Sequence, residues 1–109
     1  MKFDMNKMLQ EAQRMQEELA KAQEEAATEV VEASAGGGMV TVKANGAGEI
    51  VSITIDPKAI DPDDPALLSD LVLAAVNEAL RSSRALMESK MSGLMPGGLG
   101  DLGGLLPGA

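Results

Sequence analysis

Apolar residues recur at alternating spacings of three and four between residues 4 and 28, which is the a/d heptad pattern of an amphipathic helix. The repeating positions are Met5, Met8, Ala12, Met15, Leu19, Ala22 and Ala26. Lys7, Arg14 and Lys21 each have an acid three residues before and four residues after, so we expect ion pairs along the exposed face. Because Ala and Met bury little area, this helix should hold a partner helix only loosely.

From residue 28 to residue 55 the pattern changes to the alternation of β-strands. Three segments, 28–35, 39–44 and 49–55, are separated by the glycines at 36–38 and by Asn45-Gly46, both typical of turns. We therefore expect an antiparallel meander. Its apolar face in the second and third strands should consist of Val40, Val42, Ala44, Val51, Ile53 and Ile55.

A second long helix is predicted from about residue 65 to residue 91. Asp64 and Pro65 have the residue types of an N-cap and a first helical turn. The neighbouring Asp61 and Asp63 could suggest a calcium loop, but no Gly-x5-Glu continuation follows, so we interpret the carboxylates as structural. The first half of this helix is apolar on nearly every face, which indicates burial between the sheet and another surface.

The composition narrows the chemistry. The chain has 109 residues, a single aromatic side chain (Phe3), and no His, Cys, Trp or Tyr. The absence of Cys and His excludes a thiolate site and a Cys/His metal site, and no cofactor is expected. The sequence contains no pair of residues at the spacing of a nucleophile and its base, so an enzyme is not expected. Because a core of Met, Leu, Ile, Val and Ala is thin, assembly with a second chain is expected.

Residues 92–109 form a separate region, rich in Gly and Pro with scattered Leu. We predict one domain over residues 1–91 and a disordered tail over 92–109, with a short peptide that docks on a protein partner as the alternative. Deleting residues 93–109 should change the free energy of unfolding by less than about 1 kcal/mol.

The net charge is −8 and is unevenly distributed. Residues 1–32 carry four bases and eight acids, residues 56–70 one base and five acids, and residues 71–91 three bases and two acids. Such a chain should be repelled by phosphate unless its bases gather locally. No apolar run reaches the roughly 20 residues of a membrane span and no signal-peptide pattern is present, so a cytoplasmic protein without membrane contact is expected.

The lengths of these elements predict a shape. Helices of about 25 residues are roughly 37 Å long, whereas a strand of seven residues spans only about 23 Å, so the helices must extend past the sheet. We expect the first half of the first helix to pair with the second half of the second, which makes a projecting arm. The apolar excess on the second helix favours a two-fold dimer through Leu71, Val72, Ala75 and Val76.

Four segments together resemble the YbaB/EbfC family of bacterial nucleoid-associated proteins: MLQEAQRMQEELAKAQEE (8–25), GGGMVTVKANGAGEIVSITIDP (36–57), LLSDLVLAAVNEA (67–79) and MPGG (95–98). They occur in order over nearly the whole chain. The resemblance implies an α+β fold, a tweezer-like homodimer, and binding of double-stranded DNA through helical arms with little sequence specificity. It further implies a nucleoid location and a role in nucleoid organisation, gene regulation or repair.

The residues that would contact DNA follow from this resemblance. The third strand offers Glu49 and Ser52 rather than Arg or Lys, so DNA binding is assigned to the bases on the arms. These are Lys7, Arg14, Lys21, Arg81, Arg84 and Lys90. A protein-binding or chaperone-like dimer that grips apolar partners with Met-rich arms is the alternative, since Met adapts well to varied surfaces.

Overall fold

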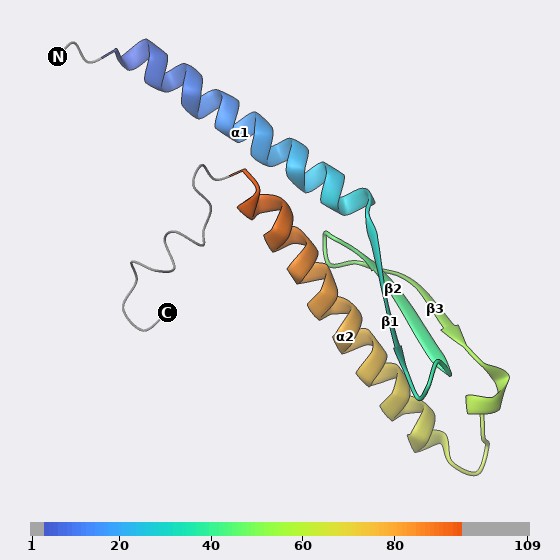
Figure 1. Cartoon of the computed structure of the whole chain (residues 1–109). Helices are drawn as coiled ribbons and strands as arrows, with labels where there is room; N and C mark the ends of the chain where they lie inside the picture. The colour runs from blue at the N-terminus through green and yellow to red at the C-terminus, as the bar shows by residue number, and fades with distance from the viewer. Residues whose placement is uncertain (1–3, 95–109) are drawn as a thin grey trace, which may run out of the picture.

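A computed structural model describes residues 4–94 (Figure 1). The chain forms a long helix, a three-stranded antiparallel sheet, a short 3-10 helix and a second long helix. In chain order these are α1 (Met5–Thr28), β1 (Val30–Ala35), β2 (Val40–Asn45), β3 (Ile50–Ile55), η1 (Pro57–Ala59) and α2 (Pro65–Ser92). The expected α+β fold is confirmed. The tail lies outside the described residues except for its first three, of which Ser92 ends α2, so its predicted disorder stays a prediction.

Both long helices begin at an aspartate cap. The Asp4 carboxylate accepts a hydrogen bond from the Lys7 backbone N–H at 3.2 Å, and Asp64 accepts one from Leu67 N–H at 3.3 Å. Pro65 follows in the first turn, where its missing N–H costs nothing. Asp61 accepts the backbone N–H of Asp63 at 2.9 Å, so these loop carboxylates organise the start of α2.

The sheet has the order β1-β2-β3, with β2 in the middle. Val42 pairs with Ala33 on one side and with Ile53 on the other. A register shift near Ala44 then places Ile50, rather than Val51, opposite Ala44. The prediction that Val51 shares the apolar face was therefore wrong at this position, because a β-bulge adds one residue to the strand and interrupts its alternation.

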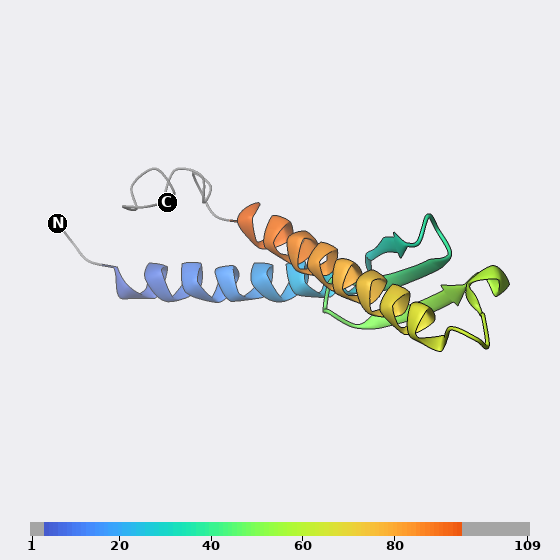
Figure 2. The same cartoon turned by 90° about the horizontal axis from the view of Figure 1, so that it is seen from below.

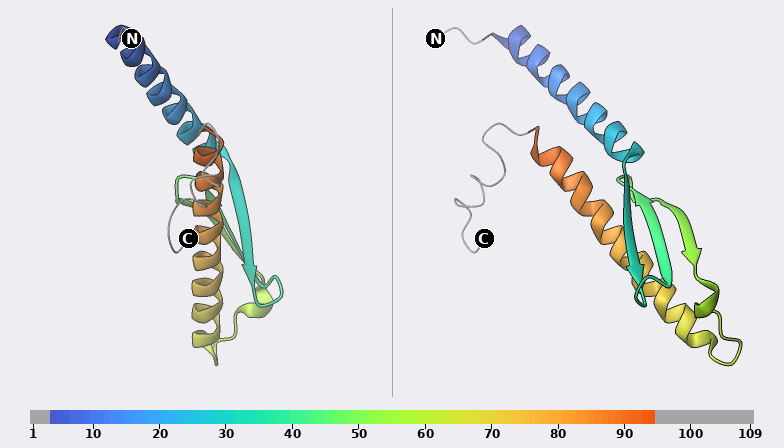
Figure 3. Two further views of the ribbon diagram at one scale, coloured as in Figure 1. Left: turned by 60° about the vertical axis from the view of Figure 1, so that its left-hand side comes forward. Right: turned by 45° about the vertical axis from the view of Figure 1, so that its right-hand side comes forward.

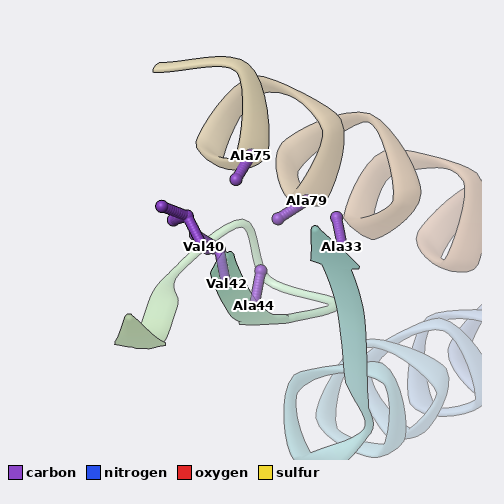
Figure 4. Packing of buried hydrophobic residues seen from close by; sticks show 6 residues of the cluster. All are labelled: Ala33, Val40, Val42, Ala44, Ala75 and Ala79. Carbon is purple, nitrogen blue, oxygen red and sulfur yellow. The ribbon is translucent and has the colours of Figure 1, made fainter. Parts of the chain in front are cut away.

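The core lies between the sheet and α2, and small side chains build it (Figure 4). Two α2 alanines face the middle strand and one residue of β1, and the six buried members are Ala33, Val40, Val42, Ala44, Ala75 and Ala79. Because four of them are alanines, the helix approaches the sheet closely but buries little apolar area per residue. The packing of one helix on one face of the sheet is therefore enough to give this short chain a buried core.

The helix α2 covers β1 and β2 and touches β3 only slightly. The inward face of β3 consequently remains open: Ile53 is 46% exposed although its neighbour Val42 is fully buried. The opposite face of the sheet is polar in its middle rows, where Glu32 pairs with Lys43 and Lys43 with Ser52. The sheet thus has an apolar face that one helix covers only in part.

The pairing of the helices differs from the expectation. Ala22 and Ala26, in the second half of α1, are buried, whereas Met5 and Met8 at its start are exposed. The first half of α1 extends beyond the end of α2 in every view (Figures 1, 2 and 3). We name residues 5–17 the arm, and β1–β3 with α2 the body.

The lengths explain why the arm is unpaired. The backbone N–H of Gly46 donates to the Ala26 carbonyl at 2.8 Å, and the Ser83 hydroxyl donates to the Asn45 carbonyl at 2.6 Å, so the three segments meet at one level. The eleven residues from Ser83 to Leu94 then span about 16 Å, which reaches back along α1 no farther than about Met15, and Leu94 itself borders Glu18. We call Ala26, Asn45, Gly46 and Ser83 the joint.

The chain is elongated, with a longest dimension of 76 Å. The acidic loop and η1 lie at the end of the body that is farthest from the arm (Figure 1). Within residues 4–94, neither helix has the length and apolar content that crossing a membrane requires.

Candidate nucleic-acid interface

Three bases project from α1. Lys7, Arg14 and Lys21 are exposed and follow one another at intervals of seven residues, about 10.5 Å apart along one side of the helix. Of the expected ion pairs along α1, the described chain forms one, between Arg14 and Glu18, at the limiting distance of 4.0 Å. Most of the ion pairs predicted along α1 are therefore absent from the described residues, because long exposed side chains gain little from pairing in water.

Two further bases lie on α2. Arg81 and Arg84 are exposed, whereas Ala79 and Ser83 between and beside them face the inside of the fold. The Arg81 guanidinium donates two hydrogen bonds to one Glu78 oxygen, at 2.7 and 3.1 Å. Among the described residues Arg84 forms no ion pair, so its charge is the more available of the two.

Lys90 lies in a different environment. Its ammonium group pairs with the Glu29 carboxylate at 2.5 Å and ties the last turns of α2 to the residue that links α1 to β1. The hydrogen bond and the charge of Glu29, with a smaller contribution from Glu25, raise the pKa of Lys90 above its ordinary value. Lys90 thus has a structural partner, which separates it from the other five predicted DNA contacts.

The six bases do not form one patch. Residues 4–28 carry three bases against six acids, whereas the second half of α2, residues 79–91, carries three bases and one acid. The balance on α2 therefore favours a phosphate group and the balance on α1 does not. Lys7 and Arg14 border a shallow groove with Gln10 and Glu11, so an acid sits beside the bases there.

The residues expected at a dimer interface divide into two pairs. Ala75 is fully buried against the sheet of its own chain, and the Leu71 side chain packs under the turn at Gly36. Val72 and Val76 instead border an open groove of about 500 Å³ between α2 and β3. The groove is lined by Ile55, Leu68, Ser69, Val72, Leu73 and Val76.

Sequence reasoning missed Leu73 at this surface. Its side chain is 60% exposed, the second-largest exposure among the large apolar residues of the described chain. The available signal was the run of apolar residues around α2, which is too wide for one sheet to cover. An apolar residue on the far side of such a helix marks a surface that needs another partner.

Comparison with known proteins identifies the family. A model of the YbaB/EbfC DNA-binding family matches residues 1–99. A nucleoid-associated protein of Saccharopolyspora erythraea is 50% identical over 109 residues, which cover 96% of this chain and 93% of that protein. A nucleoid-associated protein of Thermoanaerobacter pseudethanolicus is 52% identical over 95 residues, which cover 87% of this chain and 86% of that protein.

A solved structure has the same fold. The crystal structure of the uncharacterized protein HP0035 from Helicobacter pylori matches with a TM-score of 0.70 and 23% identity, over 81% of this chain and 92% of that one. At this identity the likeness supports the fold alone. The family match over nearly the whole chain and the relatives at about half identity carry the assignment: the chain belongs to the YbaB/EbfC DNA-binding family.

Proposed function

We propose that the protein is a homodimer that binds double-stranded DNA through phosphate contacts of its exposed helical bases, with little sequence specificity. Membership of a DNA-binding family supports DNA as the ligand, and the names of the relatives support a nucleoid location. The observation that carries the mode of binding is the set of exposed bases on α1 and on the second half of α2. Lys7, Lys21 and Arg84 form no ion pair with any residue between 4 and 94.

The dimer rests on the groove between α2 and β3. Leu73 on one wall and Ile53 near the other are 60% and 46% exposed, and the helix that shields the rest of the sheet leaves this strip open. A second copy that presents the same strip across a two-fold axis would cover both walls at once, because an isologous interface is self-complementary. Each molecule would then contribute one projecting arm.

Sedimentation tests the dimer. Leu73→Glu places a charge in the interface and should convert the dimer to a monomer at micromolar concentration. Leu67→Glu is the matched control, because Leu67 lies on the same helix, is 46% exposed and does not line the groove. A parent protein that sediments as a folded monomer would refute the dimer, and equal effects of the two variants would place the interface elsewhere.

The type of nucleic acid follows from the side chains present. Duplex should be preferred to single strands, because the chain has no Tyr or Trp and only one Phe to stack on unpaired bases. Sequence specificity should be low, because three arginines are available for paired contacts with guanine and Arg81 and Arg84 are assigned to phosphate. If about six phosphates are neutralised, the slope of log affinity against log salt should be about −5.

Charge reversal on α2 tests the contact surface. Arg81→Glu with Arg84→Glu should reduce affinity by similar factors on unrelated duplexes and leave the dimer intact. Lys43→Glu with Lys58→Glu is the matched control: it changes the net charge equally, from −8 to −12, at exposed positions of the body. The proposal predicts a much larger loss for the arginine pair, measured by gel shift at two salt concentrations.

Equal losses from both double variants would mean that overall charge, not the helical bases, governs binding. If the arginine variant binds DNA as the parent does, the basic-helix model fails. The alternative, a dimer that grips apolar protein segments, would then be favoured by the exposed methionines of the arm. The family description names DNA binding and no reaction, and we do not propose an enzyme.

A further inference from the structure

The arm carries an apolar surface that DNA binding does not use. Met5, Met8 and Leu9 are 66%, 53% and 58% exposed, and with Ala12 they line a groove of about 260 Å³. Met15 continues the same side of the helix toward the body. We name these five residues the arm stripe. Because burying Met and Leu side chains removes apolar area from water, the stripe is a substantial unused binding surface.

We propose that the chain's own tail, residues 95–109, docks along the arm stripe. The proposal goes beyond DNA binding and does not depend on it, and for residues 95–109 it replaces the disorder that their composition predicts. The first argument is the place where the tail begins. Leu94 borders a groove of about 250 Å³ with Glu18, Lys21, Ala22 and Glu25, so the chain leaves α2 against the side of α1.

The direction of the chain after Leu94 and the length of the tail both allow the tail to lie along the arm stripe. The two long helices run antiparallel, so a chain that continues past Leu94 heads toward the N-terminus of α1 (Figures 1 and 3). Ala22 and Met5 are separated by 17 residues of helix, about 26 Å, whereas 15 residues of extended chain span up to about 50 Å. The tail is therefore long enough to cover the whole stripe with slack for turns.

The chemistry of the tail also fits. It contains Met95 and four leucines (Leu99, Leu102, Leu105 and Leu106), with Asp101 as its only charged residue. Six glycines allow its backbone to lie close to a helix. Because the tail is attached beside the stripe, its effective concentration there is high, in the millimolar range for a short flexible link.

A second copy of the arm is a poorer occupant. Asp4, Glu11 and Glu18 border one side of the stripe at the same heptad position. Two arms paired antiparallel would bring these acids face to face, since g positions then meet g positions of the partner, and like charges at that distance repel. The nearly neutral tail meets no such repulsion.

Methyl NMR of the intact protein tests the proposal. The methionine methyl groups of Met5, Met8 and Met15 report on the arm, and those of Met39 and Met87 report on the body. In the variant with Leu99, Leu102, Leu105 and Leu106 all changed to Ser, the arm resonances should shift and lose their contacts to the methyl groups of these four leucines, while contacts to Leu9 remain. The body resonances should stay in place. Asp101→Ser, which keeps the leucines, is the matched control and should match the parent.

Two complementary samples sharpen the test. A synthetic peptide of residues 95–109 added to a chain that ends at Leu94 should return the arm resonances toward their parent positions, and Leu9→Glu should abolish that effect. The proposal is overturned if the parent and the serine variant have the same arm resonances. It is also overturned if the arm methyl shifts of the intact protein depend on protein concentration while those of the body do not, which would indicate that copies of the arm contact each other.

Discussion

The two halves of α1 share one heptad pattern and end in opposite environments. Ala22 and Ala26 are buried in the joint and its surroundings, whereas Met5 and Met8, on the same side of the same helix, are more than half exposed. The difference does not lie in the pattern. It lies in the length of α2, which ends at Ser92 and leaves the first turns of α1 without a neighbour among residues 4–94. Periodicity therefore predicts the helix and its apolar side, while the partner of that side is decided by element lengths.

This contrast has an energetic form. The body is held by a small, fully buried core, whereas the arm contributes charge and an apolar stripe without being part of that core. Substitutions in the buried core of the body should therefore change the free energy of unfolding, whereas substitutions of exposed bases and of the arm should change binding. Because the stability of the proposed dimer would depend on concentration, each comparison below is made at one protein concentration.

The largest expected effect comes from Val42→Ala in the body. Val42 is fully buried in the middle strand, and removing two methyl groups there should cost about 2–3 kcal/mol from lost burial and the cavity left behind. Met8→Ala on the arm is the matched truncation and should cost less, because Met8 lies outside that core. Urea unfolding followed by circular dichroism measures both. Similar costs would show that the arm is packed as firmly as the body.

The next effect tests the joint between the two regions. A Cβ atom on Gly46 would overlap the Ala26 carbonyl oxygen, so Gly46→Ala must push the end of α1 away from the β2–β3 turn. We expect a loss of about 1–3 kcal/mol in the free energy of unfolding. Gly93→Ala is the control, since φ there is −65° and the nearest atoms are at 3.6 Å. A neutral Gly46→Ala would mean that the joint is loose.

Much of the fold was predictable from local signals. The caps at Asp4 and Asp64, the turn glycines and the alternation of Val40 and Val42 each depend on a few neighbouring residues. Only the second of these caps was recognised from the sequence; the first was missed, although Asp4 precedes the first apolar repeat. The turn at Asn45-Gly46 was expected from its residue types, but the contact that requires glycine there comes from α1, far away in the sequence.

The site was less predictable, for physical reasons. Five of the six predicted bases are indeed exposed, but the ion pair of Lys90 with Glu29 joins residues 61 positions apart and leaves no local pattern. Ala75 was placed in an interface between chains because the whole face of α2 is apolar. Which part of that face the sheet covers depends on how α2 crosses the strands, and the bulge at Val51 shows how one extra residue changes a strand.

A smaller effect is expected at the other contact of the joint. Ser83 is buried and its hydroxyl donates to the Asn45 carbonyl at 2.6 Å. Ser83→Ala should cost about 1 kcal/mol, the usual net value of one hydrogen bond, because the same carbonyl also accepts the Gly48 N–H at 3.1 Å. Ser82→Ala, one residue earlier, makes no such contact and is the control. A cost for Ser83→Ala equal to that of the control would show that the bond adds no stability.

The smallest expected effect is that of the Lys90–Glu29 pair. Both side chains are partly exposed, so the pair contributes little, and high salt should reduce its contribution further. Since folding raises the pKa of Lys90 above 10.5, its contribution is complete below that pH and is lost as the pH rises through the folded-state pKa. The difference in unfolding free energy between the parent and Lys90→Met should therefore be constant from pH 7 to 9 and shrink at still higher pH. In a Glu29→Gln background the same substitution should show much less of this pH dependence, leaving only the weaker influence of Glu25. An equal dependence in both backgrounds would assign the raised pKa to other charges.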